Sequence, residues 1–429
     1  MQYAHDISGH RNIVKVAAPT GNAASLFSGG ETLHAMLKIP AEKWFSEPLE
    51  DLVGEPLADL QKKFKDTQVL IIDEKGMVGL GRLAQINRRL KQAKPEHQSL
   101  PFGGVTILLS GDFRQLPPVL DLALYSESGS TTFQCEGRVL YRMFDISICL
   151  KQSMRQAGDT NAEFRSELER LATGEFSVDD WKKWSKCNLQ QMTNERQTNF
   201  YENGTKLCAM KKNMNVFNIS HLKKTGNPIA KIKAVNSPGA ARFPADKAQG
   251  FSNILYLSKG ARIVLTNNIW AEAKLVNGSR GTVRYIIYED GKLPPNDQPA
   301  FIICQFPDYI GPSYLQTEEK LVPIVPMTRS WFEKNKQFSR TQYPIILGWA
   351  ITIHKLQGMT LDEIILDVGE KEFATGLTYT GATRTRNFGL LAFDPFPNYH
   401  RFAKIFLSKG FKSRRKEELR KLKMAAEQM

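Results

Sequence analysis

The first 150 residues alternate short apolar runs with polar, helix-forming stretches. Each run ends where polar residues begin, a pattern typical of buried parallel strands. The alternation predicts a doubly wound α/β domain, in which ligands bind at the carboxyl ends of the strands. The predicted strands are Val14–Ala18, Val69–Ile72, Val105–Leu109 and Ile146–Leu150.

A second series of the same kind predicts another α/β domain after residue 150. Residues 159–200 are expected to be helical, with Trp181 and Trp184 in the core rather than in a ligand site. Residues 260–343 are β-rich and interrupted by Gly, Pro and Asn, which predicts a small antiparallel barrel inserted in the second domain. The strands expected for the second domain are Leu207–Met210, Ile345–Gly348, Ile364–Asp367 and Leu390–Phe393, with a helix over Leu377–Arg386; those for the barrel are Ala261–Thr266, Gly281–Tyr288, Ala300–Phe306 and Lys320–Val325.

Charge and composition limit the classes of function. The net charge is +14, of which residues 409–423 supply +6, and a basic balance favours a nucleic-acid partner over a merely basic protein only slightly. The basic tail fits a nuclear-import signal, a DNA-contacting arm or a solvated helix, and its charge spacing is well explained by the solvated helix. No apolar run approaches the roughly 18 residues of a membrane span, and the N-terminus has no signal-peptide core. Five cysteines without a CxxC pair indicate a reducing compartment rather than disulfides or structural zinc.

The strongest local signal is the pair Asp73 and Glu74 at the end of a buried strand. In nucleoside triphosphatases the first carboxylate of such a pair holds Mg²⁺, usually through water, and the second orients or deprotonates the attacking water. The alternative is an acidic pair that only caps the next helix.

Two other segments of the first domain join a strand to polar residues. In GDFRQLPP, Gln115 is placed to reach a γ-phosphate or the attacking water, although a rigid proline-rich turn would have a similar composition. In APTGNAA, Thr20 and the free N–H groups of a first helical turn suit a backbone phosphate, but the segment taken alone favours an ordinary helix cap.

Two segments of the second domain carry candidate cations. Arg384 lies in YTGATRTR and could meet a triphosphate across an interdomain cleft, as an arginine finger does. Arg155, just after the junction of the two domains, could do the same. Each arginine taken alone is equally compatible with a surface cation. His354, in WAITIHKLQG, would by itself more often be a structural histidine.

Taken in order, the motifs resemble a known family. The set APTGNAA, LIIDE, GDFRQLPP, MRQ, LVNGSRGTV, WAITIHKLQG and YTGATRTR resembles the Pif-one branch of the RecD-like, superfamily-one DNA helicases, from about residue 13 to residue 400. The resemblance implies two RecA-like P-loop NTPase domains with an SH3-like β insert. It also implies a monomer that uses ATP and Mg²⁺ to move 5′-to-3′ on single-stranded DNA and to unwind duplex junctions in repair, recombination and telomere maintenance, in the nucleus or the mitochondrion.

The same resemblance assigns roles to individual residues and boundaries to domains. It makes Asp73 the Mg²⁺ ligand, Glu74 the catalytic base and Gln115 the γ-phosphate sensor, with Arg155 and Arg384 facing the phosphates. The residues expected to contact DNA are Pro19, Thr20, His34, Thr352 and His354, and Gln357 and Gly358 are expected at the nucleotide. The expected division is 1–150 (first RecA-like domain), 151–259 and 344–408 (second RecA-like domain), 260–343 (insert) and 409–429 (basic tail).

The sequence departs from the family pattern at several places, among them Leu356 and Thr383, where the family usually has serine, and two further departures concern the nucleotide site. Lys75 follows the acidic pair and would bring a cation close to the Mg²⁺ position. The phosphate-binding pattern GxxxxGK[ST] does not occur in the 429 residues. Three interpretations follow: a helicase whose nucleotide-cradling segment lies outside these residues, a non-hydrolysing single-stranded-DNA-binding module, or a transposon-derived helicase fragment.

Overall fold

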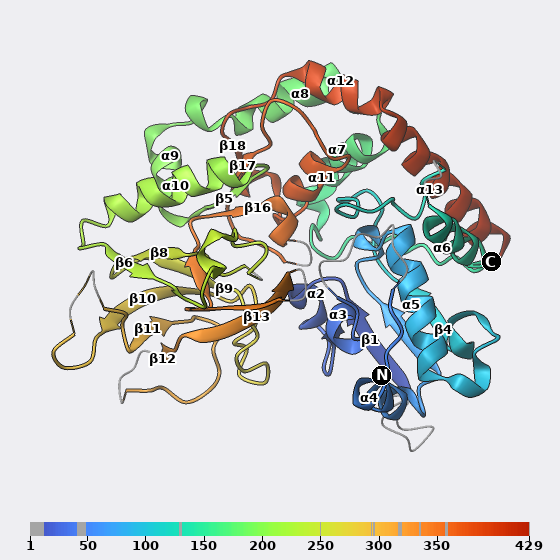
Figure 1. Ribbon diagram of the computed structural model, residues 1–429. Coiled ribbons are helices and arrows are strands. Elements are labelled where there is room, and N and C mark those ends of the chain that lie inside the picture. The colour runs from blue at the N-terminus through green and yellow to red at the C-terminus, as the bar shows by residue number, and fades with distance from the viewer. Residues whose placement is uncertain are drawn as a thin grey trace. The chain divides into compact units, whose positions relative to one another are not determined.

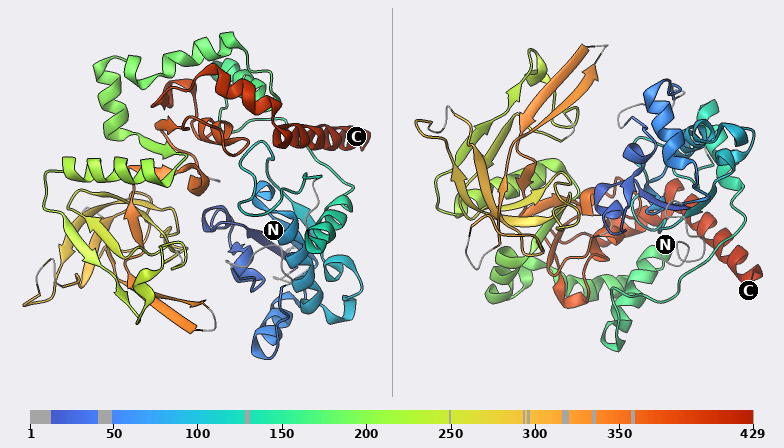
Figure 2. Two further views of the ribbon diagram at one scale, coloured as in Figure 1. Left: turned by 45° about the horizontal axis from the view of Figure 1, so that its top comes forward. Right: turned by 90° about the horizontal axis from the view of Figure 1, so that it is seen from below.

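The computed structural model describes residues 13–40, 49–127, 131–248, 250–292, 294, 297–315, 320–333, 336–356 and 359–428. The chain folds into two compact units (Figures 1 and 2). Unit 1 comprises Met1–Ala209 and Leu356–Met429, and unit 2 comprises Met210–Lys355. Unit 1 therefore contains strands from both predicted α/β domains, because residues after 355 belong to this unit again. The finer division into five segments stays a prediction.

The first sheet of unit 1 is parallel and has the order β2-β1-β3-β4. Its strands are β1 (Val14–Ala18), β2 (Glu31–Thr32), β3 (Val69–Ile72) and β4 (Thr106–Leu109), so three predicted strands are confirmed within one residue. Buried side chains of β3 pack with those of the long helix α5 in one core. The helices of this layer are α2 (Gly21–Ala24), α3 (Leu33–Met36), α4 (Glu55–Phe64), α5 (Leu80–Ala93) and α6 (Thr132–Arg142).

The strand predicted at Ile146–Leu150 is wrong. These residues form no strand, and Ile146, Ile148 and Leu150 are 71%, 83% and 94% exposed. Among the described strands β4 pairs with β3 alone, and Leu108 on β4 is 48% exposed. Alternating branched residues favour a strand, but a strand also needs a hydrogen-bonded neighbour, and no described strand lies beside this run.

The second sheet of unit 1 contains the parallel strands β5 (Thr205–Cys208), β17 (Ile364–Asp367) and β18 (Leu391–Phe393). These strands confirm three of the predicted runs, and they join segments about 150 residues apart in the chain. The helices of this layer are α7 (Ala162–Thr173), α8 (Val178–Trp184), α9 (Asn194–Asn203), α11 (Leu377–Ala382), α12 (Tyr399–Leu407) and α13 (Lys409–Glu427).

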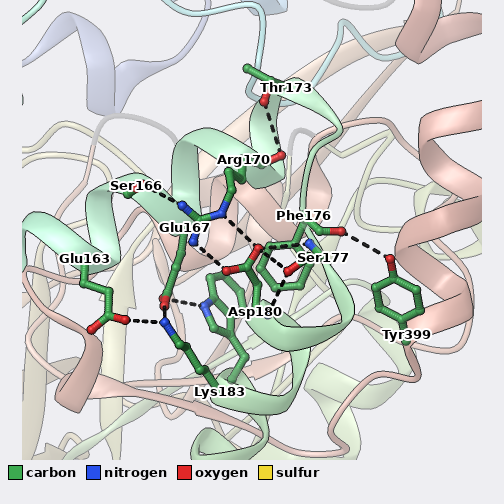
Figure 3. A network of polar contacts seen from close by, with 11 residues as sticks. Glu163, Ser166, Glu167, Arg170, Thr173, Phe176, Ser177, Asp180, Lys183 and Tyr399 are labelled. Atoms are coloured by element: carbon green, nitrogen blue, oxygen red, sulfur yellow. Dashed lines mark hydrogen bonds and ion pairs between the residues drawn. The ribbon is translucent and has the colours of Figure 1, made fainter.

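Helices α7 and α8 are held together by a polar network (Figure 3). Arg170 of α7 makes two hydrogen bonds to the Asp180 carboxylate of α8, at 2.5 and 2.9 Å. The indole N–H of Trp184 donates to Glu167 at 2.8 Å, and Trp184 is 1% exposed. Because Glu167 is buried as well, this contact satisfies a polar group that would otherwise destabilise the core. The network fixes the position of α7, and Glu169 on the same helix pairs with Arg114 of the first layer.

The prediction of helices over residues 159–200 is confirmed, and so is the core position of Trp184. Trp181 differs, because it is only partly buried and its indole N–H donates to the Pro397 carbonyl at 2.9 Å. Trp181 lines an open cavity of about 560 Å³ together with Phe396.

The basic tail is an integral part of unit 1, since α13 packs on the first layer (Figure 1). The hydroxyl of Tyr141 on α6 donates to Glu417 at 2.6 Å, and Glu417 pairs with Arg420 at 2.7 Å. Lys421 Nζ donates to the Phe144 carbonyl at 3.1 Å, and Arg414 is 2% exposed. The segment therefore forms a packed helix and not a fully solvated one, because several of its charged side chains make contacts within unit 1.

Unit 2 is built around an antiparallel sheet of order β12-β11-β10-β9-β15. All four strands predicted for the insert are confirmed, and their apolar residues form one core with those of β15. The run expected at Ile345–Gly348 is a strand, but it pairs antiparallel with β9 rather than joining a parallel sheet. The strands are β9 (Arg262–Leu265), β10 (Arg280–Ile287), β11 (Phe301–Gln305), β12 (Leu321–Ile324) and β15 (Ile345–Leu347).

The remaining elements of unit 2 are one helix and several short strands. The strands β13, β14 and β7 form a second antiparallel sheet, and β6 pairs with β8. The bounds are α10 (Lys211–Lys224), β6 (Ala230–Lys233), β7 (Val235–Asn236), β8 (Ile254–Leu257), β13 (Met327–Glu333), β14 (Lys336–Gln342) and β16 (Ala350–Thr352).

Single turns of 3-10 helix complete the fold, at Lys75–Met77, Pro95–His97, Pro101–Gly104, Asp159–Asn161, Ser185–Cys187, Leu189–Gln191, Ala240–Arg242, Ile353–Leu356 and Phe388–Leu390. In the part of the chain that the structure describes, no helix has the length and apolar character needed to cross a membrane.

Candidate functional site

The acidic pair lies where β3 and β4 leave the first sheet. Glu74 adopts a left-handed backbone conformation, with φ 54° and ψ 47°, which turns the chain sharply after the strand. The amide of Lys75 donates to the Ser110 carbonyl at 2.7 Å, so the ends of the two strands are joined. A Cβ at Gly111 would lie 2.8 Å from the Lys75 nitrogen, and glycine is therefore required for this approach. The strand ends hold Glu74 in one fixed position.

Glu74 lies among both positive and negative groups. It is 8% exposed, and burial raises its pKa. Arg384 and Arg155 oppose the rise, whereas Asp73 and Asp112 add to it. Four of the residues singled out from sequence, Asp73, Glu74, Arg155 and Arg384, are thus brought together inside unit 1 from segments far apart in the chain.

Arg384 is held rigidly beside this group of charges. Its side chain is 1% exposed, its Nε donates to the Thr380 carbonyl at 3.0 Å, and its Nη2 donates to the Thr383 hydroxyl at 3.1 Å. Burial and then Arg155 lower its pKa, which Glu74 raises in part, and the result is a pKa of about 10. The guanidinium therefore remains positive at neutral pH, as a fixed cation facing Glu74.

Arg155 and its neighbour clamp the segment that carries Arg384. Arg155 donates from Nε to the Thr360 hydroxyl at 2.8 Å and from Nη1 to the Thr383 carbonyl at 3.1 Å. The buried amide of Gln156 donates to the carbonyls of Thr383 and Thr385, at 3.2 and 2.7 Å. Sequence reasoning missed Gln156 and Thr360, although Gln156 completes the MRQ motif and was visible there.

Gln115 presents an unsatisfied acceptor. Its Oε1 is buried and has no hydrogen-bond partner among the described residues. A Cβ at Gly376 would lie 2.9 Å from the Gln115 carbonyl, so the segment before α11 packs directly on this loop. Since a buried acceptor without a partner costs about 1–3 kcal/mol, the Gln115 amide is typical of a position that a ligand or water completes.

The loop that carries Gln115 is tied to three helices. Arg114 pairs with Glu169 of α7 at 2.5 Å and lies 3.9 Å from Glu418 of α13. Tyr379 of α11 donates its hydroxyl to Asp112 at 3.3 Å, and the Arg114 amide also donates to Asp112, at 2.9 Å. These side chains were missed from sequence. Tyr379 stands at the start of YTGATRTR, but Glu169 and Glu418 carried no signal.

Lys75 is directed at an aromatic ring. Its Nζ lies 5.1 Å from the centroid of the Phe113 ring. Burial lowers the pKa of Lys75, and Asp112, Cys149 and Glu417 raise it. The positive charge of Lys75 is therefore stabilised by groups other than Asp73.

The predicted DNA-contacting residues of unit 1 lie near the end of β1. The Thr20 hydroxyl accepts a hydrogen bond from the Ala23 amide at 3.3 Å, so the helix-cap interpretation of Thr20 holds. Pro19 precedes it and ends the strand. His34 lies on α3, where burial and then Arg82 together lower its pKa to about 4. His34 is therefore neutral at physiological pH.

The other predicted DNA-contacting residues lie in unit 2. Thr352 ends β16 and is 7% exposed. His354 follows in a 3-10 turn, where burial and then Lys211 lower its pKa, so it is neutral as well. The predicted nucleotide residues Gln357 and Gly358 lie outside the described residues.

Comparison with known proteins shows similarity to DNA helicases. A family model described as PIF1-like helicase matches residues 2–180. The ATP-dependent DNA helicase PIF1 of Xenopus laevis is 29% identical over 387 residues, which cover 88% of this chain and 54% of that protein. A Bacteroides Pif1 crystal structure bound to single-stranded DNA superposes with a TM-score of 0.65 at 25% identity, covering 96% of this chain and 90% of the other. The chain is thus similar to PIF1-like helicases in sequence and in fold.

A second Bacteroides structure adds a nucleotide analogue to the comparison. This Pif1 helicase was crystallised with ADP-AlF3 and single-stranded DNA, and it matches with a TM-score of 0.64 at 25% identity, covering 94% of this chain and 90% of that one. The present PIF1-like chain spans about half the length of the curated relatives it matches. The match confirms the resemblance drawn from the ordered motifs and the α/β helicase fold.

We expect Glu74→Gln to stabilise the fold as the pH rises. Below its ordinary pKa of 4.5, Glu74 is protonated in both the folded and the unfolded chain, and the substitution should change little. Because folding raises the pKa of Glu74, the unfolded chain loses this proton at a lower pH than the folded chain does. The free energy of unfolding of the native chain therefore falls as the pH rises, whereas the glutamine of the Glu74→Gln variant carries no charge and avoids this loss. The melting temperature of Glu74→Gln minus that of the native chain should therefore grow between acid and neutral pH.

The matched control is Glu96→Gln, because Glu96 is exposed. Its melting temperature should follow that of the native chain at every pH. A loss of stability in Glu74→Gln at neutral pH would contradict the expectation, since it would mean that Arg384 and Arg155 outweigh the effect of burial.

Proposed function

We propose that this chain carries the motor part of an ATP-dependent 5′-to-3′ DNA helicase that unwinds DNA in repair, recombination or telomere maintenance. One observation carries the proposal: the buried carboxylate of Glu74 faces two arginines from distant segments and lies beside a loop whose glutamine has an unsatisfied acceptor. A carboxylate, two cations and an unpaired amide oxygen in one buried place suit phosphate hydrolysis. In this reaction negative charge develops on the phosphoryl oxygens while a water molecule attacks the phosphate. The direction of movement and the cellular roles rest on the family.

Each side chain has a task in this proposal. Glu74 accepts the proton of the attacking water, and its raised pKa brings a carboxylate closer to the pH at which a base works best. The Oε1 of Gln115 accepts a hydrogen bond from the same water or senses the γ-phosphate. Arg384 and Arg155 stabilise the charge that develops on the phosphoryl oxygens. Gln357 and Gly358 are assigned to the nucleotide from the family motif.

Asp73 fits the role of a Mg²⁺ ligand. Among the described residues no cluster of three or more His, Cys, Asp or Glu side chains could hold a metal ion alone. Mg²⁺ commonly takes one or two carboxylates and completes its shell with water and phosphate oxygens, so Asp73 with Glu74 nearby matches its needs. The bound ion would neutralise phosphate charge.

The DNA strand is proposed to contact Pro19, Thr20 and His34 in unit 1, and Thr352 and His354 in unit 2. Both histidines are neutral at physiological pH, so they would contribute hydrogen bonds or stacking instead of ion pairs with phosphates. The Bacteroides relatives bound to single-stranded DNA support this partner class.

Further assignments rest on the family pattern. The antiparallel sheet formed by β9 to β12 with β15 supports an SH3-like insert at residues 260–343. The two α/β layers support RecA-like domains at 1–150 and at 151–259 with 344–408. We also propose a monomer that acts at duplex junctions in the nucleus, with the mitochondrion as the other compartment.

A second function is favoured by one specific observation. The 429 residues contain no GxxxxGK[ST], the pattern whose backbone N–H groups, lysine and hydroxyl hold the β- and γ-phosphates. A PIF1-like chain without these groups would be a single-stranded-DNA-binding module, including one derived from a transposon. Both functions require DNA binding, and only the helicase requires hydrolysis.

The chain is expected to bind single-stranded DNA without ATP and in a salt-dependent way. The excess of 58 basic over 44 acidic residues should act mainly on phosphates. The logarithm of the binding constant should then fall with log salt by about 0.7 for each phosphate neutralised. Fluorescence anisotropy with labelled oligo-dT across a salt series measures the slope. Affinity that does not change between low and physiological salt would refute a phosphate-binding partner class.

A further inference from the structure

The outer face of the β6–β8 ribbon in unit 2 combines cations with an aromatic ring. Strands β6 and β8 are neighbours (Figure 1), and their antiparallel register places Lys231 opposite Tyr256. Side chains alternate across the ribbon: Ile232 and Leu255 are buried, at 1% and 5% exposure, whereas Lys231, Lys233 and Tyr256 face outward. Because period-two alternation fixes which side chains share a face, the two lysines and the tyrosine stand together.

A second cation and ring lie next to the ribbon, at the turn that follows β8. Lys259 Nζ lies 5.6 Å from the centroid of the Tyr285 ring, which is 47% exposed. The turn is fixed by a hydrogen bond from the Gly260 amide to the Val283 carbonyl at 2.8 Å and by one from Asn227 to the Lys259 carbonyl at 3.0 Å. We call Lys231, Lys233, Tyr256, Lys259 and Tyr285 the basic-aromatic face.

The charges of the basic-aromatic face are not neutralised within the described part of unit 2. None of its three lysines forms an ion pair with a described residue, although many other lysines of the chain do. Tyr256 is 36% exposed, and Ile254, its neighbour on the same side of β8, is 39% exposed. Unpaired cations interleaved with exposed rings on a rigid backbone match single-stranded nucleic acid, whose phosphates need cations and whose unpaired bases stack on aromatic side chains.

We propose that the basic-aromatic face binds a single DNA strand, with phosphates on the three lysines and bases stacked on Tyr256 and Tyr285. The proposal rests on the proposed function and adds to it a strand contact separate from Thr352 and His354, the residues assigned to DNA in the same unit. An acidic protein or an anionic membrane would pair with the lysines, but neither has unpaired bases that could stack on the tyrosines. The tyrosine variants test this difference.

The first experiment removes charge. Lys231→Gln/Lys233→Gln should bind oligo-dT less tightly at low salt, and its salt slope should be shallower by about 1.4, or 0.7 for each lysine. The matched control is Lys62→Gln/Lys65→Gln, which removes two exposed lysines from the end of α4, and its slope should equal that of the native chain. Equal effects in the two pairs would overturn the proposal, since binding would then reflect net charge alone.

The second experiment removes stacking and keeps the charge. Tyr256→Ala and Tyr285→Ala should each weaken oligo-dT binding about tenfold, whereas Tyr256→Phe and Tyr285→Phe should bind like the native chain. Affinity for a blunt duplex should be unchanged in all four, because its bases are paired. An oligonucleotide carrying 5-iodouracil should photo-crosslink to Tyr256 or Tyr285, identified by mass spectrometry.

The outcomes separate this inference from the function on which it rests. Strong oligo-dT binding by the native chain with no loss in the alanine variants, or crosslinks confined to other residues, would overturn the basic-aromatic face alone. An equal loss of duplex binding in the alanine variants would also overturn it. Absence of any DNA binding by the native chain would overturn both. All substituted residues are exposed, and thermal melts check that each variant folds.

Discussion

Residues 1–429 are expected to release no phosphate from ATP above the rate of their own Glu74→Gln variant. Hydrolysis needs glycine-rich backbone N–H groups, a lysine and a hydroxyl around the β- and γ-phosphates, and the sequence has no such pattern. Nearby groups do not replace it: Gly29-Gly30 is followed by the anion Glu31, and Lys75 lies over the Phe113 ring. Phosphate release with and without single-stranded DNA measures the rate.

The complementary experiment supplies a phosphate cradle. Among the described strands β4 pairs with β3 alone, so its other edge can pair with an added strand. A fusion that places a strand, a GxxxxGK[ST] loop and a helix before residue 1 should gain DNA-stimulated hydrolysis, and Glu74→Gln in that fusion is the blank. Rapid DNA-stimulated turnover by residues 1–429 alone, abolished by Glu74→Gln, would contradict the expectation and would mean that other residues hold the phosphates.

In a form that hydrolyses ATP, Arg384→Ala should lower kcat by a factor of about 10³–10⁵, the range measured for arginine fingers. The reason is the position of Arg384, a buried cation that faces Glu74 and is fixed by Thr380 and Thr383. Affinity for DNA without ATP should change little. Steady-state kinetics and anisotropy on the same preparation measure the two properties.

Two variants separate catalysis from folding. Arg386→Ala removes an exposed arginine of the same motif and should keep kcat near the native value. Arg384→Lys keeps the charge but loses the forked donor geometry, so it should fold and still be slow. A loss confined to DNA binding would place Arg384 in the strand path instead of the hydrolytic site. Thermal melts of all three variants show whether the buried position tolerates the change.

Several elements were determined by local sequence. The strands at Val14–Ala18, Val69–Ile72 and Ile364–Asp367 have the predicted bounds, because a short, mainly apolar run ended by polar residues fits a buried parallel strand. The same rule placed Asp73 and Glu74 at a strand end. The ordered motifs also carried the resemblance to PIF1-like helicases, since residues that approach a phosphate or a strand are constrained in type and spacing.

Other features were decided only by tertiary contacts. Ile146–Leu150 has the pattern of a strand but lies exposed, and Ile345–Leu347 is a strand whose partner, β9, was not visible from its own residues. The basic segment after residue 408 became a docked helix because Tyr141 and Arg114 lie within reach of Glu417 and Glu418.

The site shows the same division between local and distant information. Sequence placed Glu74 at the end of β3, but its raised pKa and the lowered pKa of Arg384 arise from burial and from charges that other segments bring close. The neutral state of His34 follows in the same way from its enclosure and from Arg82. The sequence by itself therefore determined which groups are present and which strand ends carry them. The tertiary structure decided their charge states and partners, because solvation and Coulomb interactions depend on neighbours distant in the chain.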